Sequence, residues 1–128
     1  MKSIEFCTFK QCNSLKNIII PDSVESIGND AFSECSSLTS VEIPYSVKAI
    51  GKRAFWKCSS LKSIKTHGSV KSIGDDTFGK CSSLISIEIP SSIDISILGI
   101  DSGVEVKKIW IKYFLLLLLE VYRLSDFN

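Results

Sequence analysis

The sequence contains little of what catalytic and metal-binding sites require. Among 128 residues there is a single histidine, His67, which excludes most zinc sites and most histidine-dependent triads. A glycine-rich phosphate loop and a Gly-x-Ser-x-Gly motif are also missing. Fifteen basic and fourteen acidic residues leave a formal net charge of +1, so the overall charge favours neither nucleic acid nor membranes. We therefore predict no enzymatic activity, no metal, no cofactor and no nucleic-acid partner.

What the sequence does contain is a repeat of 23 residues. Several residue types recur with this step, in phase, over four cycles. The clearest columns are cysteine (Cys12, Cys35, Cys58, Cys81), phenylalanine (Phe9, Phe32, Phe55, Phe78) and leucine (Leu15, Leu38, Leu61, Leu84). A single unit of this size cannot bury its own apolar face, whereas stacked units form one continuous core. The spacing therefore predicts a solenoid.

Each unit carries the signals of one coil. Val41, Glu42 and Ile43 alternate between apolar and polar, which is the period of a half-buried strand. Pro44 then ends the strand, because proline has no N–H to donate to a neighbour. The stretch 29–32 is long enough for one helical turn on the other side of the coil. Strands of successive coils would pair in parallel, about 4.8 Å apart.

Two segments carry a resemblance to a known family. IPDSVESIGNDAFSECSSL (20–38) and IPYSVKAIGKRAFWKCSSL (43–61) closely resemble the BspA-like class of leucine-rich repeats, and the likeness covers residues 1 to about 93. The resemblance implies an α/β-type solenoid: a right-handed coil of about four to five turns, with a parallel concave β-sheet and short helical turns on the convex side. It also implies a surface antigen or adhesion protein that binds host or matrix proteins.

The repeat divides the chain into four parts. We predict a partial first repeat over 1–14, core repeats over 15–93, a degenerate last repeat over 94–111, and an apolar C-terminal segment over 112–128. In the last repeat, a fifth strand at 106–111 would place Trp110 beside Glu88. For 112–128 we expect a terminal helix over the end of the solenoid, with a membrane-associating tail or a non-native end as alternatives.

The first residues already lie within a repeat and do not resemble a signal peptide. The sequence is therefore expected to be a fragment of a longer array or a shortened copy of one. The location in the cell stays open. The resemblance indicates the cell surface or secretion, whereas a chain complete as written would be cytoplasmic.

The cysteine spacing argues against disulfides and metal clips. No two cysteines lie within four residues of each other, and side chains stacked in register suit disulfide geometry poorly. We expect Cys12, Cys35, Cys58 and Cys81 to form a column of buried thiols. His67 stands where other repeats have proline, so we expect a solvated side chain in a turn.

The outward positions of the predicted concave sheet are the first candidate binding surface. They are Ile19, Glu42, Lys65, Glu88 and Trp110. The three charged members would alternate in sign across neighbouring strands. Ile19 and Trp110, at the two ends, are candidate anchors for a protein partner or, alternatively, are covered by neighbouring repeats or by the tail.

A second candidate surface arises because charge is uneven along the sequence. Residues 17–47 hold five acids and no base, and residues 48–72 hold seven bases and no acid. Within the basic stretch, Trp56 with Arg53 and Lys57 could bind a polyanion or an acidic protein. The alternative is an ordinary solvated surface.

The sequence therefore supports two kinds of function. The first is a protein–protein interaction module, adhesin-like by resemblance, that acts through the concave face. The second is a structural solenoid or intracellular scaffold whose uncovered ends pair with other coils and produce homo-oligomers. Neither identifies the partner.

Overall fold

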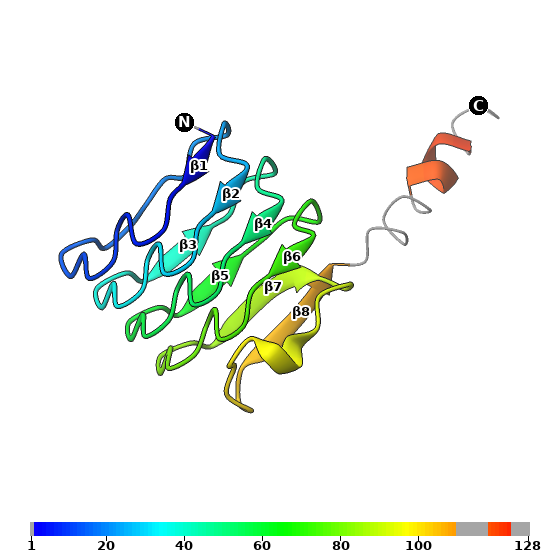
Figure 1. Ribbon diagram of the computed structural model, residues 1–128. Coiled ribbons are helices and arrows are strands. Elements are labelled where there is room, and N and C mark those ends of the chain that lie inside the picture. Colours follow the sequence, from blue (N-terminus) through cyan, green and yellow to red (C-terminus); the bar gives the residue numbers. More distant parts are fainter. Residues whose placement is uncertain (1, 110–117, 124–128) are drawn as a thin grey trace.

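A computed structural model describes residues 2–109 and 118–123, and the described chain forms a solenoid of about five coils (Figure 1). In the described residues, the central coils contribute one strand to each of two sheets, and the first and last coils contribute a strand to one sheet each. The elements, in chain order, are β1 (Ser3–Ile4), β2 (Ser26–Ile27), β3 (Ser40–Glu42), β4 (Ala49–Ile50), β5 (Ser63–Lys65), β6 (Ser72–Ile73), β7 (Ser86–Pro90), the 3-10 helix η1 (Ile95–Ile97) and β8 (Glu105–Ile109). The predicted leucine-rich-repeat solenoid with parallel pairing is confirmed.

The two sheets run the length of the solenoid with all strands parallel. One has the order β1-β2-β4-β6 and the other β3-β5-β7-β8. Strands pair with equivalent residues one repeat away, as in Ser40 with Ser63 and Ser63 with Ser86. Residues at the same position in successive repeats therefore lie side by side and contact one another.

The predicted short helical turns are wrong for the repeats. Each coil instead makes a non-helical turn with two residues in the left-handed region, as at Asp30 (φ 57°) and Glu34 (φ 60°). The turn is not helical because alternate N–H groups donate to the next coil. Those of Asp30, Phe32 and Glu34 donate to backbone carbonyl oxygens there, with N···O distances of 2.7–3.0 Å. Those donors would be needed within the segment for a helix. The turns thus form a third ladder between coils.

Columns of identical side chains fill the interior. Phe32, Phe55 and Phe78 are buried, and consecutive rings stack with centroids 5.2 Å and 6.1 Å apart. Offset-stacked rings at such distances stabilise a core beyond their buried area. The continuous core that the repeat predicts is therefore present.

The cysteine column is buried as predicted from Cys35 to Cys81, whereas Cys12 is half-buried. Each buried thiol donates to the carbonyl of a phenylalanine in the preceding coil, as Cys58 Sγ does to Phe32 O at 3.2 Å. Burial raises the pKa of Cys35 and of Cys81 to about 11, and raises that of Cys58 further. The thiols are therefore neutral and have little nucleophilic character.

The last coil is shorter than the others, which changes the predicted register. The fifth strand exists as β8, but Ser86 pairs with Glu105, only 19 residues later, and Glu88 pairs with Lys107. The shortening coincides with η1, where Asp94 caps the helix by accepting from the Ser96 N–H. The predicted pairing of Trp110 with Glu88 is therefore wrong, and Trp110 lies outside the described residues.

Part of the predicted C-terminal segment 112–128 also lies outside the described residues. Residues 118–123 are helical, and the placement of a terminal helix over the solenoid end stays a prediction. Among the residues that the structure describes, no helix is long and apolar enough to cross a membrane.

Candidate functional site

The outer face of sheet β3-β5-β7-β8 presents a row of alternating charge. In β3, β5 and β7 an apolar residue is buried between two polar residues, so these two neighbours face outward. The row comprises the consecutive register partners Glu42, Lys65, Glu88 and Lys107. Three of these residues are exposed and Glu88 is half-buried. Lys107, which the sequence reasoning missed, occupies the position predicted for Trp110.

A second row on this face is polar and contains three serines and one glutamate. It consists of Ser40, Ser63, Ser86 and Glu105, paired along the same ladders. Beside it, Ile85 is exposed, and at the N-terminal end of the charged row the Ile19 side chain is 95% exposed. The predicted candidates Ile19, Glu42, Lys65 and Glu88 thus share one surface, which we name the charged sheet face.

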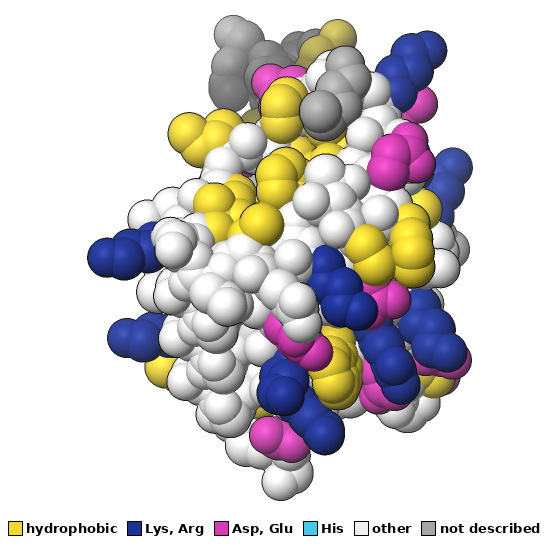
Figure 2. All heavy atoms as spheres, turned by 60° about the vertical axis from the view of Figure 1, so that its left-hand side comes forward, with side chains coloured by type: hydrophobic (Ala, Val, Ile, Leu, Met, Phe, Trp, Pro, Cys, Tyr) yellow, Lys and Arg dark blue, Asp and Glu magenta, His cyan; other side chains and the backbone are white. Residues whose placement is uncertain are grey.

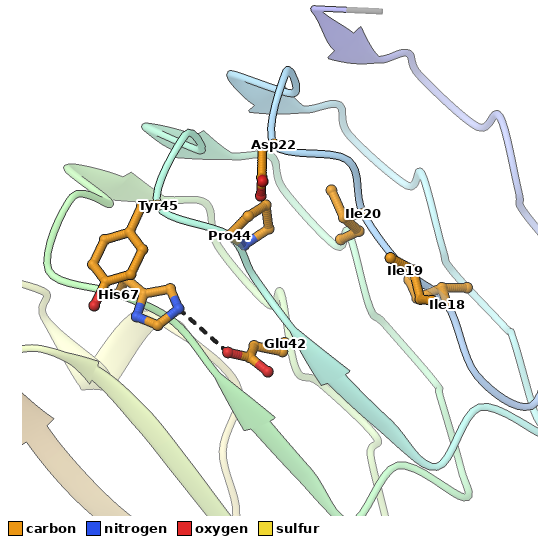
Figure 3. A pocket seen from close by; sticks show the side chains of 8 residues that line it. All are labelled: Ile18, Ile19, Ile20, Asp22, Glu42, Pro44, Tyr45 and His67. Carbon is orange, nitrogen blue, oxygen red and sulfur yellow. Dashed lines mark ion pairs between the residues drawn. The ribbon is translucent and has the colours of Figure 1, made fainter.

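A pocket of about 360 Å³ opens at the Ile19 end of the charged sheet face (Figure 3). Its lining residues are Ile18, Ile19, Ile20, Asp22, Glu42, Pro44, Tyr45 and His67. They come from three successive coils, where the chain leaves the strand and turns. The pocket combines an aliphatic wall, two carboxylates and two aromatic rings.

His67 is part of this pocket, which corrects the prediction of a solvated turn residue. Its ring stacks on Tyr45 with centroids 3.8 Å apart and planes 13° from parallel. Nε2 lies 3.5 Å from Glu42 Oε1, and the His67 side chain is only 14% exposed. One hint of this contact is visible in the sequence. His67 occupies the repeat position at which Pro44 stands one coil earlier, so it lies just after its strand, close to where Glu42 lies in the preceding coil.

Trp56 forms a second cluster, on the turn side of the coil. The cations of Arg53, Lys57 and Lys80 lie 5.4 Å, 5.8 Å and 5.5 Å from the ring centroid. These distances allow cation–π attraction. A Cβ added at Gly79 would come within 2.9 Å of the Trp56 ring, so glycine in the next coil leaves room for the indole. The sequence identified three of these residues and missed Lys80.

Acidic residues also lie on the same side of the solenoid as the Trp56 cluster. Figure 2 shows the molecule turned so that the left-hand side of Figure 1 comes forward. In this view basic and acidic side chains are interspersed and are not separated by sign. Two acids stand in register with Arg53, since Asp30 and Asp76 share its repeat position. The cation cluster is therefore local and does not extend into a groove. No group of three or more His, Cys, Asp or Glu side chains suited to a metal ion occurs among residues 2–109 and 118–123.

Comparison with known proteins agrees with this architecture. The family model described as the BspA type leucine rich repeat region matches residues 1–100 in six copies. The chain belongs to this family. Proteins with leucine-rich repeats generally serve as binding scaffolds, and they generally bind protein partners. No curated protein sequence matches the chain.

Two solved structures share both fold and sequence with the chain. A leucine-rich repeat protein from Bacteroides ovatus is 35% identical with a TM-score of 0.79, over 85% of this chain and 28% of its own. A leucine rich cell surface protein from Faecalibacterium prausnitzii is 31% identical with a TM-score of 0.74, over 84% and 29%. This chain therefore spans less than a third of the length of either protein.

A third structure supports the fold alone. The leucine-rich repeat protein of T. pallidum is 24% identical with a TM-score of 0.59, over 84% of this chain and 63% of its own.

Proposed function

We propose that the protein is a recognition module that binds another protein through the charged sheet face. The observation that carries the proposal is the row Glu42, Lys65, Glu88 and Lys107, which alternates in sign across four neighbouring strands. In the described residues, no two members of the row approach within 4 Å as an ion pair. Their charges therefore remain available to a partner.

The physical role of this row is specificity. Exposed ion pairs contribute only about 0–1 kcal/mol each, so the row adds little stability to the solenoid itself. Across an interface, the same charges select a partner of complementary pattern and increase the association rate. The serine row beside them leaves room for a close approach of another chain, and exposed Ile19 supplies apolar area at one end.

We further propose that the partner is a host or matrix protein met at the cell surface. One observation supports this: the Faecalibacterium protein, 31% identical, is described as a leucine rich cell surface protein.

Binding to a panel of immobilised extracellular-matrix proteins, measured by surface plasmon resonance, tests the proposal. The decisive variant exchanges charges within the row, Glu42→Lys with Lys65→Glu, which keeps the net charge. The matched control exchanges Glu25→Lys with Lys48→Glu, two exposed residues in register on another side of the coil. The proposal predicts that the first exchange abolishes binding and the second does not. Equal effects of the two exchanges would contradict it.

Assembly through the solenoid end is a second candidate function. Phe9, Cys12, Leu15 and Ile18 are only partly buried, although their equivalents one coil later are buried. Phe9, Leu15 and Ile18 line an apolar hollow of about 390 Å³ together with Ile4 and Phe32. A coil of a second chain stacked there would continue the columns.

Sedimentation velocity of the intact chain and of a variant lacking residues 1–14 separates the two functions. End-to-end assembly predicts concentration-dependent oligomers that change on this deletion, with Ile18→Glu as a milder version. An oligomer that the deletion leaves unchanged would contradict assembly through this end.

A further inference from the structure

We infer that the pocket of Figure 3 holds a lysine or arginine side chain of the partner protein. This inference rests on the proposed function and deepens it, because it identifies which chemical group of the partner is anchored at one end of the charged sheet face. Three properties of the pocket carry it: the sign of its charges, the composition of its walls, and the way one carboxylate is held.

The charged groups of the pocket favour a cation. Asp22 and Glu42 line it from two successive coils, and no lysine or arginine is among its lining residues. The Glu42 side chain is 68% exposed, and within the described part of the chain the basic group beside its carboxylate is the His67 imidazole, with Nε2 3.5 Å from Oε1. Asp22 is exposed and makes no ion pair there. Both carboxylates can therefore accept hydrogen bonds from an arriving cation.

The walls of the pocket suit the long aliphatic stem of such a side chain. Ile19 is 95% exposed on one side, and Tyr45 is 71% exposed on the other. Lysine and arginine bury their methylene groups along apolar surfaces while the charged end stays hydrated. An exposed tyrosine ring adds cation–π attraction. A small inorganic cation would gain nothing from this apolar surface, whereas a lysine or arginine side chain uses both parts.

His67 acts as a positioning residue. Its ring is stacked on Tyr45, and its Nε2 lies beside Glu42 Oε1 (Figure 3). The imidazole thereby restrains both the tyrosine ring and the carboxylate before the partner arrives, which lowers the entropy lost on binding. His67, which stands at the repeat position of Pro44, is thus the residue through which the third coil completes the pocket.

The single histidine also gives a direct assay. The intact protein labelled with ¹³C-histidine has one imidazole Cε1–Hε1 signal, so its NMR shift reports this pocket alone. The probes are the tripeptides Gly-Lys-Gly and Gly-Arg-Gly, with Gly-norleucine-Gly as the control that has the stem and lacks the charge. The expected result is a saturable shift in the millimolar range for both cationic peptides and none for the norleucine peptide.

Two variants locate the contact. Glu42→Gln and Asp22→Asn keep the shape and remove one carboxylate each, and each should weaken tripeptide binding by about fivefold. Glu25→Gln, an exposed carboxylate outside the pocket, should leave it unchanged. Circular dichroism confirms that the variants are folded.

The inference is overturned if the norleucine peptide shifts the signal equally, if no peptide shifts it, or if Glu42→Gln and Asp22→Asn bind as the unsubstituted chain does. If the tripeptides fail while the exchange of Glu42 and Lys65 still abolishes binding to a matrix protein, the pocket assignment is wrong and the proposed function stands. If the tripeptides bind and no matrix protein does, the pocket stands and the proposed partner fails.

Discussion

Replacing Phe55 with leucine tests whether the coils stabilise one another through the stacked columns. Phe55 is fully buried and stacks on Phe32 at 5.2 Å and on Phe78 at 6.1 Å, so the substitution removes two ring contacts. Each aromatic pair contributes about 0.5–1.5 kcal/mol beyond area, which gives a loss of about 1–3 kcal/mol for Phe55→Leu. Phe9 is half-buried and has one stacked neighbour, Phe32, so Phe9→Leu should cost about half as much or less.

Urea unfolding followed by circular dichroism gives these free energies of unfolding. A double-mutant cycle sharpens the test: Phe32→Leu and Phe55→Leu should be coupled by about 0.5–1.5 kcal/mol, since the rings touch. Phe9→Leu and Phe55→Leu, two coils apart, should be additive. Equal losses of unfolding free energy for Phe9→Leu and Phe55→Leu, or strong coupling between these two substitutions, would show that the stabilising contacts are not confined to adjacent coils.

Three further predictions concern other columns. Gly51→Ala should destabilise the fold by about 1 kcal/mol or more in urea unfolding, because its Cβ would meet backbone atoms of Gly28 and Asn29 at 2.5–2.6 Å; a neutral outcome would show that the corner between coils is loose. Burial raises the pKa of Cys35 and Cys81 from 9.0 to about 11, so the folded chain holds their protons more tightly than the unfolded chain. The stability that these thiols contribute should therefore be complete below about pH 9 and be lost as the pH rises from 9 to 11, and a flat profile over that interval would contradict the buried column. Lys57→Gln with Lys80→Gln should weaken retention on immobilised heparin if the cations around Trp56 bind anions, and unchanged retention would exclude that role.

The repeat made most of the architecture predictable. A step of 23 residues identifies which side chains share a column, and alternation within the unit identifies the buried members of β3 and β5. Glu42, Lys65 and Glu88 could be placed on one face for the same reason. Such inference is reliable where equivalent residues keep the same spacing, because parallel pairing then brings equal positions together.

The errors arose where spacing or hydrogen bonding could not be obtained from the pattern. Trp110 was misplaced because the last coil is four residues shorter than its predecessors, from Ser86 to Glu105, and no residue type marks where the deletion falls. The pattern predicts a helical turn at 29–32, but the N–H groups of Asp30 and Phe32 donate to carbonyls of the next coil. Local sequence carries no information on that choice, since the acceptors lie 22 residues away.

His67 shows the same limit at the candidate site. Its position in the proline column was visible, but its contacts join Tyr45 and Glu42, which belong to the preceding coil. A single histidine without a nearby partner in sequence was therefore interpreted as solvated. The pocket depends on how three successive coils meet, and that follows only from the assembled structure.

The charged sheet face is proposed as the surface that binds a protein. Carbodiimide footprinting of carboxylates by mass spectrometry tests it most directly, with the chain free and then saturated with the matrix protein that it retains best. If the partner binds this face, labelling of Glu42 and Glu88 falls on binding while labelling of Glu25 and Asp75 is unchanged. Protection of Glu25 or Asp75 with Glu42 and Glu88 still fully labelled would contradict it.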